Sequence, residues 1–292
     1  MNTVNDRRSP SRRAYLGALY GRIKSLTSII LGRKRKPVSP LLAQPMEQIL
    51  KRHAWICSLL REHLPDSHLY VGRNVCEAGA GDCLAAASML LGLGASHVTI
   101  VEHEPPVTGS KQFDVLENLC ALGHPCDKTI LDYKNQLNES KCSFFTSYME
   151  TFAGRGDCSL VYSICVGEHV EDLTAFFRSC YDTLVQGGEM MHYIDLGGHG
   201  IFEDPVPPLE MHRYGRIAYG AIFPQYSRAT RRFISDYVKA ASESGFHSIS
   251  VRATRKADEN YVKGILPHLK SHAVGAPEDE LSVIEFVLHA KK

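Results

Sequence analysis

The sequence predicts an α/β fold around a seven-stranded, mostly parallel sheet with an antiparallel C-terminal strand. Short apolar stretches typical of buried strands recur along the chain, and helical stretches separate the early ones. Buried strands that alternate with helices form a parallel sheet with right-handed crossovers. The expected strands are residues 74–78, 98–102, 142–146, 158–165, 188–194, 247–253 and 281–289.

Helices are expected where apolar residues recur with helical spacing. Gly94, Gly123 and Gly245 each follow such a stretch, and glycine suits the left-handed turn that ends a helix. Residues 256–280 show no helical period, so the last two strands are expected to form an antiparallel end of the sheet. The expected helices are residues 46–64, 83–93, 111–122, 171–185 and 230–244.

The composition is that of an ordinary soluble globular protein, with 44% hydrophobic and 22% charged residues among 292. No apolar stretch reaches the roughly 20 residues that a membrane-spanning helix needs. The nine cysteines are spread singly without a CxxC pair, which favours reduced thiols over a structural zinc site. We therefore expect a cytoplasmic protein.

The N-terminal region differs in charge from the rest of the chain. Residues 1–36 contain ten Lys or Arg and one acid, so the net charge of +1 hides a basic arm before an acidic body. Apolar residues at helical spacing predict an amphipathic helix inside this arm. We expect it to dock on the body; the alternative is peripheral contact with an anionic membrane. The predicted domains are an arm of residues 1–45 and a body of residues 46–292.

A glycine turn follows the first expected strand, in the stretch VCEAGAGDC. Gly79 and Gly81 let backbone N–H groups approach a ligand closely. A nicotinamide or flavin fingerprint has a third glycine, but Leu84 stands there, which disfavours a dinucleotide oxidoreductase. Glu77 precedes the turn, and Glu102 ends the next strand, where a carboxylate can accept ribose hydroxyls.

These features together resemble the class I S-adenosylmethionine-dependent methyltransferases, over about residues 70–292. The resemblance implies a Rossmann-like class I methyltransferase fold with an N-terminal helical extension, and S-adenosyl-L-methionine as cofactor. It also implies that Glu102 binds the ribose. The family often has an acid against adenine, where this chain has a tyrosine, so stacking or backbone contacts are expected there instead. The implied contacts are Glu77, Ala78, Gly79, Ala80 and Gly81 around methionine and ribose, Tyr148 and Met149 near adenine, and Ser163 and Ile164 near the sulfonium.

Catalytic candidates follow the fourth and fifth expected strands, at the carboxyl edge where open α/β sheets bind ligands. A hydroxyl nucleophile usually needs a base. We expect His199 to be this base, oriented by Asp195, with His169 as the alternative. The spacing of Asp195 and the nearby histidines is no recognised ligand motif, so no metal is predicted.

The expected reaction moves the sulfonium methyl to a hydroxyl, or an amine, of a small-molecule or glycan acceptor. A looser resemblance points to a bacterial subgroup found with surface-sugar and secondary-metabolite pathways. An insert at about residues 196–229 suits a substrate lid. Two alternatives stay open: an RNA methyltransferase that uses the basic arm, disfavoured by few aromatic residues there, and a non-catalytic cofactor-binding scaffold. The sequence leaves the oligomeric state open.

Overall fold

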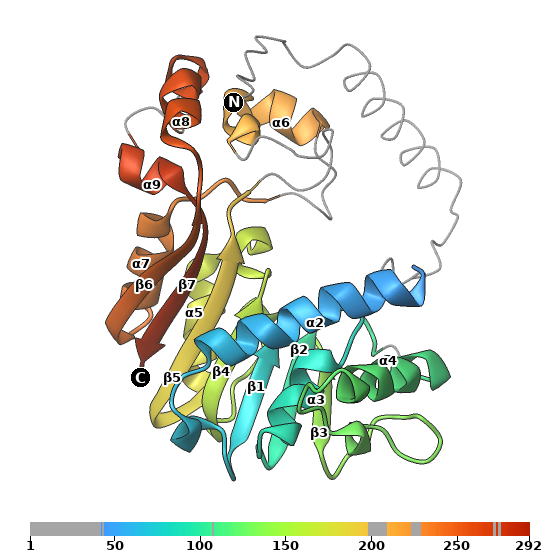
Figure 1. Cartoon of the computed structure of the whole chain (residues 1–292). Coiled ribbons are helices and arrows are strands. Elements are labelled where there is room, and N and C mark those ends of the chain that lie inside the picture. Colours follow the sequence, from blue (N-terminus) through green and yellow to red (C-terminus); the bar gives the residue numbers. More distant parts are fainter. Residues whose placement is uncertain are drawn as a thin grey trace, which may run out of the picture. The chain divides into compact units, whose positions relative to one another are not determined.

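The computed structural model describes residues 42, 44–106, 108–197, 209–222, 229–270, 273 and 276–292 (Figure 1). These residues form two compact units. The larger unit takes its residues from Pro37–Asp195, Arg232–Thr254 and Glu285–Lys292, and the smaller from Leu196–Arg231 and Arg255–Ile284. The basic arm, its amphipathic helix and His199 lie outside the described residues, so the expectations about them stay predictions. The predicted domain boundaries also stay predictions.

The described part of the chain contains one seven-stranded sheet in the order β3-β2-β1-β4-β5-β7-β6. The pairings among the first five strands are parallel, whereas β7 runs antiparallel to β5. This arrangement confirms the predicted Rossmann-like fold with an antiparallel C-terminal strand. The strands are β1 Asn74–Ala78, β2 His97–Glu102, β3 Cys142–Thr146, β4 Cys158–Ile164, β5 Leu184–Asp195, β6 His247–Lys256 and β7 Val283–Lys291.

Helices pack on both faces of the sheet in the larger unit (Figure 1). On one face, α2 packs against α3 and α4, and these helices share a core with β1, β2 and β5. On the other face, α5 and α7 pack together, and Tyr237 of α7 meets Phe286 of β7 with ring centroids 5.4 Å apart. These helices are α2 Met46–His63, α3 Ala85–Gly92, α4 Ser110–Ala121, α5 Leu173–Thr183 and α7 Ile234–Glu243.

Alternation along β5 divides its side chains between the two faces. Tyr193 belongs to the core that includes α2, whereas His192 contacts the rings of Phe176 and Phe177 of α5, with centroids 5.3 and 5.6 Å away. Asp195 follows Tyr193 at a spacing of two and therefore lies on the α2 face. The side chains of Asp195 and His192 therefore point to opposite faces of the sheet.

The prediction that residues 256–280 are non-helical was wrong. In the smaller unit, Asp258 caps α8 by accepting a hydrogen bond from the Tyr261 N–H at 3.1 Å, and Val262 and Ile265 are buried. The aspartate cap and the burial of these two apolar residues on one face stabilise this helix of two turns. The described helices of the smaller unit are α6 Arg216–Ile222, α8 Glu259–Ile265 and α9 Glu278–Ser282, and its short 3-10 turns are Glu210–Arg213 and Leu266–His268. Short 3-10 turns of the larger unit are Ser67–Leu69, Lys128–Ile130, Met149–Thr151 and Gly167–His169.

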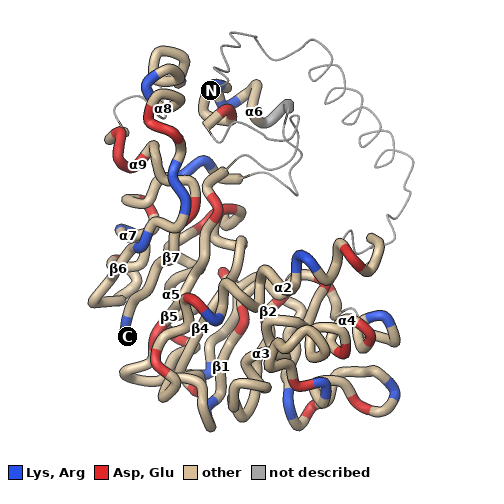
Figure 2. The backbone as a smooth tube through the Cα atoms, viewed as in Figure 1, with Lys and Arg blue, Asp and Glu red and all other residues tan. Residues whose placement is uncertain are grey.

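Surface charge on α4 and the segment up to β3 is mixed. Lysines are interspersed there with Asp and Glu (Figure 2). Lys128 pairs with Glu117 at 3.1 Å, and Lys141 with Asp127 at 3.7 Å. This part of the surface therefore lacks the single-sign stripe that a nucleic-acid backbone attracts. Among the described helices, none combines the length and hydropathy required to cross a membrane.

Candidate functional site

The glycine turn joins the carboxyl end of β1 to the segment before α3. Gly79 has φ +78° and Gly81 has φ +62°, a region that glycine enters without the steric cost of a Cβ. A Cβ on Gly79 would lie 2.5 Å from Val166 Cγ2, whereas one on Gly81 would have none of the described atoms within 4 Å. The turn is thus closely packed at Gly79 and open at Gly81.

Glu102 meets this turn from the end of β2. Its buried carboxylate accepts a hydrogen bond from the Gly81 N–H through Oε2 at 2.7 Å. Oε1 accepts from the backbone N–H groups of His103 at 2.8 Å and Glu104 at 3.3 Å. The structure therefore brings together the two features that the sequence separates by twenty-one positions, and it fixes the carboxylate with backbone donors.

Sequence reasoning missed His103, which lies beside Glu102. Its Nδ1 is 2.5 Å from Glu102 Oε1, and its ring stacks on Tyr148 with centroids 5.1 Å apart and an interplanar angle of 13°. Tyr148 is 61% exposed, while Met149 is buried at the start of the turn after β3. An exposed aromatic stack therefore adjoins the strand-end carboxylate. In the sequence, the only available signal for this stack was that a histidine directly follows Glu102.

Glu77 lies below the turn rather than on its open side. Its side chain is buried and accepts a hydrogen bond from the Tyr162 hydroxyl at 2.9 Å. Burial raises the pKa of Glu77 to about 8, and the nearby Glu102 charge adds to this, although the Tyr162 hydrogen bond opposes it. Ala78 is buried as well, and Ala80 is half-buried. Glu77 therefore supports the turn from inside the core.

Ser163 and Ile164 end β4, next to β5. The Ser163 hydroxyl is buried and lies 2.7 Å from Nδ1 of His192, on the face that α5 covers. Burial lowers the pKa of His192 to about 3, so its ring is neutral at pH 7. Ile164 pairs with Tyr193 across the two strands. Ser163 therefore offers only its backbone to a ligand at the carboxyl edge.

The described catalytic candidates lie at that edge on neighbouring strands. His169 follows β4, and its Nε2 is 3.9 Å from Oε1 of the buried Glu168. Asp195 ends β5 and is paired with Glu285 of β7. Because Asp195 and His192 lie on opposite faces, these two side chains do not converge on one ion. The predicted orientation of His199 by Asp195 stays a prediction.

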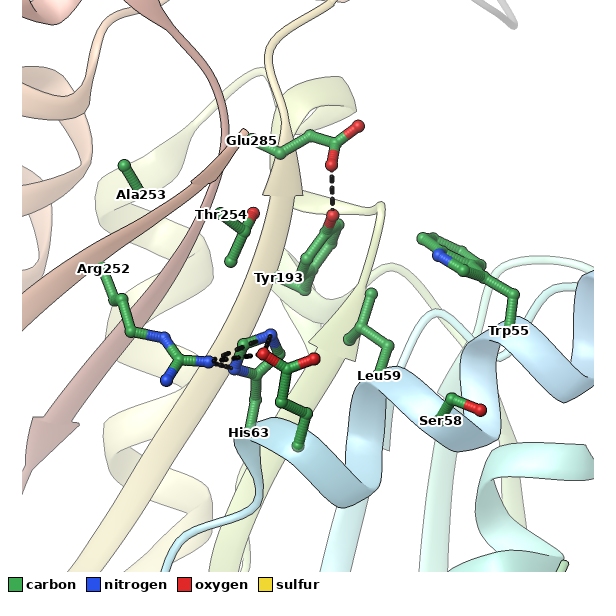
Figure 3. Close-up of a pocket in the computed structure, with 10 residues that line it drawn as sticks. Trp55, Ser58, Leu59, His63, Tyr193, Arg252, Ala253, Thr254 and Glu285 are labelled. Carbon is green, nitrogen blue, oxygen red and sulfur yellow. Dashed lines mark hydrogen bonds and ion pairs between the residues drawn. The ribbon is translucent and has the colours of Figure 1, made fainter. Parts of the chain in front are cut away.

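A cavity of about 490 Å³ lies on the α2 face of β5, and the sequence did not indicate it. Tyr193 points from β5 toward Glu285 of β7, and its hydroxyl donates a hydrogen bond to Glu285 Oε2 (Figure 3). Trp55 of α2 and Arg252 of β6 line the cavity on either side. Because Tyr193 precedes Asp195 by two positions, the two side chains lie on the same face of β5. This face therefore presents a phenol hydroxyl as well as the Asp195 carboxylate.

Comparisons with known proteins give only distant structural likenesses. No family model matches the chain, and no curated protein matches it. Among solved structures, an S-adenosylmethionine-dependent methyltransferase from Mesorhizobium loti is 16% identical, with 86% of this chain and 100% of that chain covered and a TM-score of 0.47. A geranyl diphosphate methyltransferase in complex with S-adenosylmethionine is 13% identical, with coverage of 88% and 92% and a TM-score of 0.47. At these scores the strand order itself, rather than the likeness, identifies the fold.

Proposed function

We propose that this chain is an S-adenosylmethionine-dependent methyltransferase. The observation that carries the proposal is the hydrogen bond from the Gly81 N–H to Glu102 Oε2 at 2.7 Å. It joins the glycine turn after β1 to the carboxylate at the end of β2, inside a sheet whose β7 is antiparallel. Ligands of open α/β sheets bind outside the carboxyl ends of the strands, which is where this pair lies.

The residues at this edge fit the cofactor. A carboxylate oxygen accepts two hydrogen bonds, so Glu102 Oε2 can take a ribose hydroxyl beside the Gly81 N–H. Gly81 leaves room for a ligand, since a Cβ there would have no described atom within 4 Å. The stacked rings of His103 and Tyr148 provide an exposed aromatic surface for a planar base. The proposed cofactor contacts are the loop Glu77 to Gly81, in which the buried side chain of Glu77 takes no part, and Glu102, Tyr148, Met149, Ser163 and Ile164.

The bound cofactor would supply an activated methyl group, and this chain's residues would position the acceptor and exclude water. The proposed acceptor is a small molecule or a glycan with a hydroxyl or amine. His199 stays the proposed base for its proton, oriented by Asp195 at the end of β5, and His169 after β4 stays the alternative. A cytoplasmic location belongs to the same proposal, with residues 1–36 docked on the body and peripheral membrane contact as the alternative.

Isothermal titration calorimetry tests the cofactor assignment directly. We expect the wild-type protein to bind S-adenosylhomocysteine, the demethylated cofactor, at one site per chain. Reduced nicotinamide adenine dinucleotide is the matched control, because it also carries adenine and ribose hydroxyls. Binding of the dinucleotide without S-adenosylhomocysteine would contradict the proposal and favour the oxidoreductase alternative.

A further inference from the structure

Leu42 and Gln44 lie just before α2, which begins at Met46 in the larger unit. We call this pair the strap residues. Leu42 is buried and Gln44 is exposed, and neither belongs to a helix or a strand. The backbone groups of the buried Leu42 therefore need hydrogen-bond partners outside regular secondary structure.

The side chain of Leu42 packs into a small apolar core between α2, α4 and the segment after the glycine turn. The first turns of α2 lie beside α4 (Figure 1). Cys83 and Ala85 of this core come from the segment after the turn, and Val115 and Leu119 come from α4. Burial of Leu42 therefore anchors the chain before α2 to two separate elements at once.

Hydrogen bonds hold the backbone of the strap residues to the same two elements. The Leu42 N–H donates to Oδ2 of Asp82 at 3.4 Å. On the other side, Nζ of Lys111 donates to the Leu42 carbonyl and, at 3.2 Å, to the Gln44 carbonyl. An ammonium group has three donors, so one lysine can bind two carbonyls. Asp82 and Lys111 are thus the polar supports of the strap residues.

These two supports belong to the segments that follow the glycine turn and the proposed ribose carboxylate. Asp82 comes directly after Gly81, whose N–H donates to Glu102 Oε2 at 2.7 Å. Lys111 is the second residue of α4, the first helix after Glu102. A ligand that fixes Gly81 relative to Glu102 therefore also restricts the motion of Asp82 relative to Lys111.

We propose that Lys111 is a positioning residue of the cofactor site, and that docking of the strap residues and cofactor binding strengthen each other. This inference rests on the proposed function, because it takes S-adenosylmethionine as the ligand of the glycine turn. Lys111 has no proposed contact with the cofactor and acts through the strap residues. Coupling between two sites is reciprocal, so the cofactor stabilises the docked strap residues as much as they stabilise the bound cofactor.

Amide hydrogen exchange measures docking of the strap residues, because the Leu42 N–H exchanges when its bond to Asp82 opens. We would follow deuterium uptake of the full-length protein by mass spectrometry, with and without saturating S-adenosylhomocysteine. We expect the ligand to slow exchange in the peptide that contains Leu42 at least about fivefold, the lower end of typical coupling between sites. A peptide from β6, at the far edge of the sheet, is the control and should not change.

Lys111→Met removes every donor of this side chain and keeps an unbranched residue that suits a helix. We expect calorimetry to show at least about fivefold weaker binding of S-adenosylhomocysteine, and we expect the ligand to slow exchange near Leu42 no longer. Leu42→Ala, which removes the buried anchor, should have the same two effects. Lys239→Met, at an exposed lysine of α7, is the matched control and should bind within about twofold of wild type. Circular dichroism confirms that each variant is folded.

Equal affinity of the wild type and folded Lys111→Met for S-adenosylhomocysteine would overturn the inference, as would exchange near Leu42 that the ligand leaves unchanged. In either case the strap residues stabilise the fold alone, and the proposed function stands. Equal weakening by Lys111→Met and Lys239→Met would assign the effect to lost positive charge and contradict the role of Lys111. Failure of the wild type to bind S-adenosylhomocysteine would contradict the proposed function and this inference with it.

Discussion

The hydroxyl of Tyr162 donates a hydrogen bond to Glu77 Oε2 over 2.9 Å, between partner residues of β1 and β4. Both side chains are buried in the middle of the sheet, directly below the glycine turn. An acid in this position keeps its proton to an unusually high pH, since burial raises the pKa of Glu77 to about 8. The support of the turn is therefore sensitive to pH.

Glu77→Gln should change how stability depends on pH. Below about pH 4.5 the carboxyl of Glu77 is protonated in the folded and unfolded chains alike. Between pH 4.5 and about 8 only the unfolded chain loses the proton, so the free energy of unfolding of the wild type falls as pH rises, by up to about 1.4 kcal/mol per pH unit. The variant lacks this loss. Urea denaturation at several pH values should show that the free energy of unfolding of the variant rises relative to that of the wild type toward pH 8. Parallel profiles would contradict the raised pKa of Glu77.

Ser163→Ala should destabilise the protein through His192. The substitution leaves Nδ1 of a buried, neutral ring without its partner at 2.7 Å, which costs about 1–3 kcal/mol. Adding His192→Phe removes the unsatisfied ring and should recover part of the loss. Ser250→Ala, at an exposed serine of β6, is the control. If the single and double variants unfold at the same urea concentration, the hydrogen bond does not stabilise the fold.

Gly79→Ala should cost more stability than Gly81→Ala. Both glycines have positive φ, so alanine suffers the left-handed strain of roughly 1–2 kcal/mol at either position. At Gly79 the new Cβ also meets Val166 Cγ2 at 2.5 Å, and valine is a stiff, branched side chain. Val166→Ala should therefore restore stability in the Gly79→Ala background and not in the Gly81→Ala background. Equal rescue of both in thermal denaturation would count against this packing.

The strands and most helices could be predicted from the sequence because local patterns determine them. Apolar runs mark β1 to β4 to within a residue, and a glycine follows α4 and α7 closely. The start of β5 was missed by four residues, since Gly187 and Gly188 interrupt the apolar run and the β4–β5 register shifts there. The helix α8 was missed because seven residues are too few to establish a period.

The candidate site was predictable where one strand end supplies a group and not where distant segments meet. Glu102 could be located because it ends an apolar strand after a glycine turn. The contact of Tyr193 with Glu285 joins residues 92 positions apart through an antiparallel register that no local pattern reveals. Likewise, the stack of His103 on Tyr148 requires the ends of β2 and β3 to be neighbours.

Binding of S-adenosylhomocysteine to Glu102 variants tests the central claim most directly. Glu102→Gln keeps an oxygen that can accept the Gly81 N–H, and Glu102→Ala removes every acceptor. If Glu102 binds the ribose, calorimetry should show weaker binding in both variants, with Glu102→Ala losing roughly 1.5–3 kcal/mol and Glu102→Gln losing less. An affinity equal to that of the wild type in folded Glu102→Ala would contradict the claim that this carboxylate and the glycine turn form a cofactor site.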